Sequence, residues 1–80
     1  MKLWIGNISA DVTSDELTAL LHKYGGPGFD AMLKVPGDGS RPGVLLTFDS
    51  AGAEVLYRLA ERLNGVYWKH KGLAVQVMLH

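Results

Sequence analysis

The sequence predicts an α+β fold in the order βαββαβ, with two helices covering one face of a four-stranded antiparallel sheet. Two observations predict it. Four short segments are rich in apolar residues that recur at every second position, which is typical of strands. After the first and the third of these segments, apolar residues recur at helical spacing, and each helical pattern stops at glycine.

The first strand is expected at residues 1–5. Leu3 and Ile5 would face the core, and Lys2 and Trp4 would face the other way, because successive side chains of a strand point to opposite faces. Trp4 would therefore lie on the side of the sheet that the helices do not cover.

The first helix is expected to start after Thr13, because a threonine followed three residues later by Glu16 forms a capping box. A stripe of apolar side chains then repeats at i, i+3, i+4 and i+7. Its members are Leu17, Leu20, Leu21 and Tyr24. The glycines and the proline at 25–28 end this helix.

The second and third strands are expected at 29–35 and 43–48, joined by a loop at 36–42 that is rich in turn residues. In the second strand the odd-numbered residues are expected to face the core. The even-numbered residues, which include Met32 and Lys34, are expected to face outward.

The second helix is expected after a cap at Asp49 or Ser50, and Asn64 and Gly65 end it. Its buried stripe comprises Leu56, Leu59, Ala60 and Leu63. A connecting segment at 67–72, read as a small hairpin, leads to a last strand at 73–79. The odd-numbered residues of this strand would face the core and the even-numbered ones the open side.

Composition excludes several classes of protein. The chain has no cysteine, which excludes disulfides and thiolate metal sites. No apolar run approaches the roughly 18 residues of a membrane span, and the first residues lack the pattern of a secretory signal. We therefore expect one domain over 1–80, complete from Met1, in a cytoplasmic protein that acts as a monomer and does not associate with membranes.

No pattern of residues predicts catalysis. No serine or threonine has an evident base partner, and the histidines lack the spacing of metal ligands. The glycines at 25–28 and the loop at 36–42 lack the spacing of phosphate-binding loops. We therefore expect no enzyme activity, no metal and no cofactor.

Residues 3–8, Leu-Trp-Ile-Gly-Asn-Ile, resemble the hexamer on the first strand of the RNA-recognition motif. The third-strand octamer of that family corresponds to residues 41–48, and Leu63-Asn64-Gly65 resembles the usual end of its second helix. The chain is thus similar to a divergent member of this family over its whole length. The resemblance implies a ferredoxin-like βαββαβ sandwich.

The octamer departs from the family pattern at the places that matter for binding. The family stacks bases on aromatic residues of the open face, two of them at the third and fifth places of the octamer. Those places hold Gly43 and Leu45 here, which leaves Trp4 as a single platform. Stacking contributes about 1–3 kcal/mol per base, so two missing platforms would cost roughly 2–6 kcal/mol.

The resemblance implies non-catalytic binding of single-stranded RNA, weak and of low specificity, by the open face and adjacent loops. Trp4 would stack one base, basic side chains would contact phosphates, and Gln76 would read base edges. The expected RNA-binding residues are Trp4, Lys2, Asn7, Met32, Lys34, Arg41, Gly43, Leu45, Lys71, Gln76 and Met78.

The distribution of charge bears on the same question. The net charge is zero, with eight basic and eight acidic residues, which counts against strong non-specific binding of nucleic acid. Five basic residues fall on strands and loops, which predicts a modestly positive sheet side. These are Lys2, Lys34, Arg41, Lys69 and Lys71.

Two other functions stay open at this point. Domains of this family that lack the aromatic residues often bind proteins, and the zero net charge favours such a role. Alternatively, RNA binds through the loops at 8–12, 36–42 and 67–71 alone. Trp4 would lose its role as a stacking platform if the segment with Tyr67 and Trp68, or the chain end, covered it. The simpler interpretation of Trp68 is that it caps the end of the core.

Overall fold

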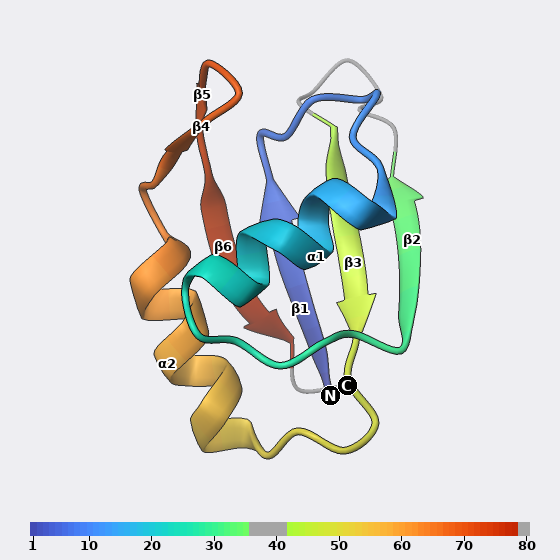
Figure 1. Cartoon of the computed structure of the whole chain (residues 1–80), viewed down its shortest axis with the longest axis vertical. Coiled ribbons are helices and arrows are strands. Elements are labelled where there is room, and N and C mark those ends of the chain that lie inside the picture. The colour runs from blue at the N-terminus through green and yellow to red at the C-terminus, as the bar shows by residue number, and fades with distance from the viewer. Residues whose placement is uncertain (36–41, 79–80) are drawn as a thin grey trace.

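The computed structural model describes residues 1–35 and 42–78, and in these the helices and the main sheet form two layers (Figure 1). The sheet has the strand order β2-β3-β1-β6, and every neighbouring pair is antiparallel. Its strands are β1 (Lys2–Gly6), β2 (Ala31–Val35), β3 (Gly43–Thr47) and β6 (Ala74–Met78). Helices α1 (Ser14–Lys23) and α2 (Ala53–Leu63) cover one face, and a two-stranded hairpin of β4 (Tyr67–Trp68) and β5 (Lys71–Gly72) precedes β6. The predicted fold class is confirmed.

The core lies between the helices and the inner face of the sheet. Leu3 and Ile5 of β1 are fully buried, and Phe48 after β3 is 1% exposed. All the residues of the two predicted helical stripes are buried except Tyr24, which is partly exposed and packs against the core. Among the described residues no polar or charged residue is buried, so this core consists of hydrophobic side chains.

The predicted start of α1 is confirmed in detail. The Glu16 N–H donates to Thr13 Oγ1 (3.2 Å), and the Thr13 N–H donates to Glu16 Oε1 (3.0 Å). Val12 and Leu17, which flank the cap, are both fully buried. The capping box and the hydrophobic contact beside it therefore fix the direction in which the chain enters the helix.

The predicted cap of α2 is wrong. The helix begins at Ala53, and its N-cap is Gly52, which has no side chain to accept a hydrogen bond. Asp49 lies too far upstream to cap this helix. Its N–H donates to the Asp30 carboxylate (2.6 Å), which ties this connection to the chain before β2. Helix α2 therefore depends on the burial of its apolar stripe more than on its cap.

The predicted facing of β2 is also wrong. Met32 lies opposite Leu46 of β3, and Lys34 lies opposite Val44. Cross-strand partners share a face, so Met32 and Lys34 lie on the helix side, because the β3 residues they oppose are buried there. Leu33 consequently lies on the open face and is 60% exposed. The pattern misleads because β2 has apolar residues on both faces and only its register against β3 decides between them.

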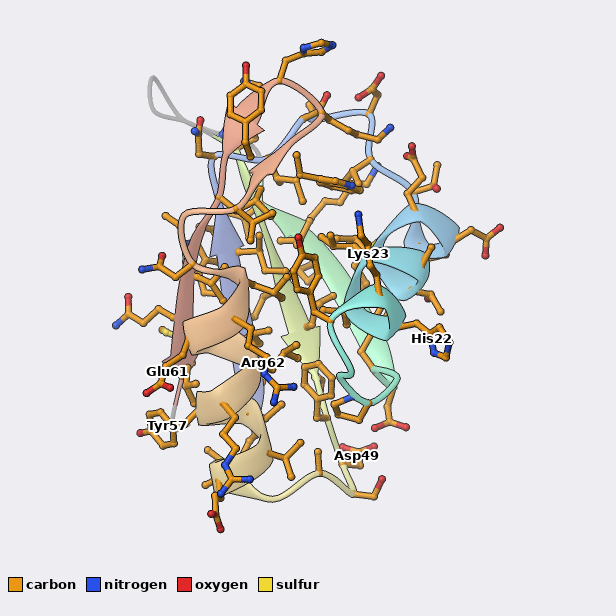
Figure 2. The ribbon with its side chains drawn as sticks, turned by 60° about the vertical axis from the view of Figure 1, so that its left-hand side comes forward. His22, Lys23, Asp49, Tyr57, Glu61 and Arg62 are labelled. Atoms are coloured by element: carbon orange, nitrogen blue, oxygen red, sulfur yellow. The ribbon has the colours of Figure 1, made fainter. Side chains whose placement is uncertain are left out.

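The two helices and the hairpin are tied together by polar contacts on the helix side. The Arg62 side chain of α2 points toward α1 (Figure 2), where its Nη1 donates to the Tyr24 carbonyl (3.2 Å). Lys69 of the hairpin forms an ion pair with Glu16 of α1, and the Trp68 ring packs against the core. The predicted hairpin and the capping role of Trp68 are both confirmed. Neither described helix is long and apolar enough to span a membrane.

The cap of α1 gives a test of local stability. We expect Thr13→Ala to lower the free energy of unfolding by about 1 kcal/mol, because it removes the side-chain acceptor of the capping box. Urea unfolding measures the change. Thr18→Ala is the matched control: Thr18 is exposed in the middle of the same helix, and its loss is expected to change stability by less than about 0.5 kcal/mol. Equal effects of the two substitutions would contradict the role of the cap.

The ion pair of Glu16 predicts a dependence of stability on pH. The Lys69 ammonium, followed by the Thr13 N–H, lowers the pKa of the Glu16 carboxyl below its ordinary value of 4.5. Because the folded pKa is depressed, the stabilisation by Glu16 is present above pH 4.5 and is lost as the pH falls through the folded pKa. The stability difference between wild type and Glu16→Gln should therefore shrink between about pH 7 and about pH 3 in urea titrations. A difference that stays constant over this range would show that Glu16 does not act through its charge.

Candidate functional site

The open face of the sheet, opposite the helices, is the candidate site. The registers of the strands arrange its side chains in three rows that cross the sheet. From β2 to β6 the rows are Ala31–Thr47–Lys2–Met78, Leu33–Leu45–Trp4–Gln76 and Val35–Gly43–Gly6–Ala74. Only one of these twelve residues, Lys2, carries a charge. The predicted facing of β1, β3 and β6 is confirmed.

The indole of Trp4, in the middle row of this face, leans over two glycines of the next row. Gly6 and Gly43 are paired across β1 and β3. A Cβ atom on Gly43 would lie 2.4 Å from Cζ2 and Cη2 of Trp4, and one on Gly6 would lie 3.0 Å from its Nε1. The ring therefore occupies the space above the glycine pair. This contact gives a structural reason for glycine at 43, where the family pattern has an aromatic residue.

Trp4 keeps part of its surface exposed. The segment that was a candidate to cover it lies elsewhere: Trp68 lines a groove with Leu20 and Lys23 of α1, on the helix side. The other candidate cover, the chain end at 79–80, lies outside the described residues. Within 1–35 and 42–78, Trp4 is thus the aromatic residue of the open face.

The neighbours of Trp4 divide the face into an aliphatic side and a polar side. In the row of Trp4, Leu45 and Leu33 lie toward β2, and Gln76 lies toward β6 with its side chain exposed. Met78, in the next row, is 39% exposed. Leu33 was not predicted as a site residue, and the only signal that could have found it is the pairing register of β2.

Several predicted binding residues do not lie on the open face. Lys34 lies on the helix side, where its Nζ donates to the Ala10 carbonyl (3.3 Å) beside an apolar cavity of about 260 Å³. Met32 packs against the core from the same side. Arg41 lies outside the described residues.

Two predicted residues lie at the edge of the face. Asn7 has a left-handed backbone (φ 58°), and its Nδ2 donates to the Gly72 carbonyl (2.8 Å), which ties the end of β1 to the hairpin. Lys71 lies opposite Trp68 in this hairpin and is partly buried. Both residues lie near the loops, so any contact with a ligand would occur there.

The predicted positive sheet side is not found in the described part of the chain. Lys34 lies on the helix side, and Lys69 is paired with Glu16 of α1. Lys2 is the one basic residue that the registers place on the open face. The described part of the face is therefore largely apolar and nearly uncharged.

Comparisons with known proteins support the fold. No family model matches the sequence, and no curated protein matches it. Among solved structures, the RRM of Rna15 with bound RNA (GU) is 16% identical with a TM-score of 0.71, over 99% of this chain and 83% of that one. The RRM3 domain of Mip6 is 14% identical with a TM-score of 0.76, over 94% and 89%. The RNA recognition domains 1 and 2 of Sex-lethal from Drosophila melanogaster are 22% identical with a TM-score of 0.67, over 92% and 46%.

These similarities define the class of the chain by its fold. The structure matches RNA-recognition-motif (RRM) domains over nearly the whole chain, at identities of 14–22%. The chain has the fold of RRM domains, as the hexamer and the element order predict.

The contact between Trp4 and Gly43 can be tested by a double-mutant cycle. We expect Gly43→Ala to lower the free energy of unfolding by about 1–3 kcal/mol, because the new methyl group meets the indole. In the background of Trp4→Ala the same change should cost much less, since the two nearest atoms belong to the indole, and the next atom, the Ile5 carbonyl oxygen, lies 3.0 Å from the added Cβ. Urea unfolding of the four proteins gives the coupling. Additive effects would mean that the ring does not rest on Gly43.

Proposed function

We propose that this chain binds single-stranded RNA with the open face of its sheet and the adjacent loops, without catalysis, as a monomer in the cytoplasm. The observation that carries the proposal is the partly exposed indole of Trp4 at the centre of that face, above the Gly6–Gly43 pair. Domains of this fold present aromatic rings to unstacked bases from the same strands. A relative of the same fold, the RRM of Rna15, has been solved with bound RNA.

The single aromatic ring sets the expected strength of binding. RNA recognition motifs stack two or three bases on the sheet, each worth about 1–3 kcal/mol. Here Trp4 supplies one platform, and Leu33 and Leu45 beside it offer aliphatic contact without a ring face. Among the described residues Lys2 is the one cation on the face, so the attraction of phosphates is expected to be small. Binding should therefore be weak.

The polar groups near Trp4 set the expected specificity. Gln76 lies beside Trp4 in the same row, where its amide can donate to and accept from the edge of a stacked base. The aliphatic residues on the other side of Trp4 make no hydrogen bonds. One amide beside one stacked base discriminates little, so the proposed specificity is low. Asn7, Lys71 and Arg41 are proposed as further contacts from the loops.

A protein partner is the second candidate. The observation that favours it is the low charge of the open face, with one charged residue in twelve, together with the exposure of Leu33 (60%) and Met78 (39%). Exposed apolar patches of this kind often mark interfaces between proteins. An RNA ligand and a protein ligand would compete for the same surface.

An NMR titration separates these functions. Labelled protein is titrated with pools of short RNA oligomers while the backbone amides and both indole signals are followed. Movement of the Trp4 indole and of the amides of β1 and β3 supports binding on the sheet. Movement confined to the loops favours loop binding, and no movement at millimolar RNA removes RNA from the proposal.

Substitution of Trp4 tests the platform directly. We expect Trp4→Ala to weaken the binding of short RNA by about 5- to 150-fold, because it removes the stacking of one base. Fluorescence anisotropy with labelled oligomers measures the affinity. Tyr57→Ala is the matched control, since Tyr57 is an aromatic residue with 47% exposure on α2, off the rows of the open face and outside the adjacent loops. A loss of affinity in the control as large as in Trp4→Ala would place the RNA elsewhere.

A further inference from the structure

Strand β6 is an edge strand, and part of its outer edge is open. Residues before it already pair with that edge: the Leu73 N–H donates to the Val66 carbonyl (2.9 Å), and the Gly65 N–H donates to the Leu73 carbonyl (2.8 Å). The Val75 N–H donates to Asn64 Oδ1 (3.0 Å). The odd-numbered residues of this segment thus direct their main-chain groups away from β1.

The same alternation extends to Val77, whose N–H and carbonyl also point outward. Within residues 1–35 and 42–78, no hydrogen bond uses either of these groups or the Val75 carbonyl. Three main-chain groups therefore lie along one stretch of strand edge. Such an edge is a template for an added strand unless something blocks it.

A groove runs beside this edge. It has a volume of about 250 Å³ and lies between α2 and β6. Tyr57 and Glu61 project from the side of α2 that faces away from α1 (Figure 2), and Tyr57 is 47% exposed. The groove is lined by Tyr57, Ala60, Glu61, Asn64, Val75, Gln76 and Val77. An edge whose main-chain groups have no partner among the described residues, beside a partly apolar groove, has the form of a site for strand addition.

The charge of the groove indicates its occupant. Within 1–35 and 42–78, Glu61 is the one charged residue of the lining, so a basic side chain on the added strand would be complementary. A second copy of this chain fits less well, because pairing of two β6 edges about a two-fold axis brings the two Glu61 carboxylates toward each other.

We propose that the outer edge of β6 binds an extended peptide segment of a partner protein as an added strand, with apolar side chains in the groove and a lysine or arginine at Glu61. The peptide pairs with the Val75 carbonyl and with both main-chain groups of Val77. This site lies at the edge of the sheet and uses main-chain groups, whereas the proposed RNA site uses side chains of the open face. The failure of one proposal therefore does not contradict the other.

The test uses the whole chain and a blocked hexapeptide that alternates valine and threonine and carries one lysine. We expect shifts of the Val75 and Val77 amides and slower hydrogen exchange of the Val77 amide at saturation, with the Trp4 indole unchanged. An unchanged exchange rate of Val77, or no shift at millimolar peptide, overturns the proposal. Shifts of Val77 that grow with protein concentration alone would assign the edge to a second copy instead.

Two pairs of controls isolate the chemistry. A peptide with glutamate in place of lysine should bind about 2- to 5-fold more weakly, and Glu61→Lys should reverse that order. Val77→Pro removes the outward N–H of residue 77, whereas Val77→Ala shortens the side chain but keeps this N–H. The proline variant should bind about fivefold more weakly than the alanine variant. If the proline variant misfolds, the hydrogen exchange of the Val77 amide and the charge reversal at Glu61 still test the proposal. Peptide binding that does not depend on the charge of residue 61 overturns it.

Discussion

The pairing of β1 on both of its edges is the constraint on which the rest of the structure depends. β3 and β6 flank this strand, and its alternation sends Leu3 and Ile5 into the core while Trp4 faces the open side. The five residues of β1 thus contribute side chains both to the core under the helices and to the candidate site on the other face. A change that shifts the register of β1 would exchange these two faces at once.

The sequence predicts the fold well where local chemistry and long-range packing agree. The capping box at Thr13 and the stripes of both helices contain the information that specifies α1 and α2, and the structure confirms them. The start of α2 is not predicted, because two residues with good capping side chains, Asp49 and Ser50, precede a helix that begins after Gly52. The N–H of Asp49 donates to Asp30, which is 19 residues earlier in the chain. A contact over that separation cannot be predicted from a local pattern.

The candidate site is predicted less completely, for a physical reason. The facing of β1 and β6 follows from clear alternation, so Trp4, Lys2, Gln76 and Met78 are found where the pattern places them. Strand β2 has apolar residues on both faces, so its facing depends on a partner strand, and Met32 and Lys34 exchange places with Leu33. For the described residues, the pattern overestimates the positive charge of the face, because Lys34 and Lys69 have partners on the helix side and those contacts exist only in three dimensions.

The fit of the Trp4 ring over Gly43 limits the order in which substitutions at these positions are tolerated. An aromatic side chain introduced at 43 meets the indole at once, so that the gain of a second ring has to follow the loss or shrinkage of the first. A smaller ring at position 4, such as that of phenylalanine or tyrosine, can come first, and it keeps an aromatic platform on the described part of the face. An aromatic residue at 43 thus depends on a prior change at position 4. As long as Trp4 is present, its ring restricts position 43 to glycine.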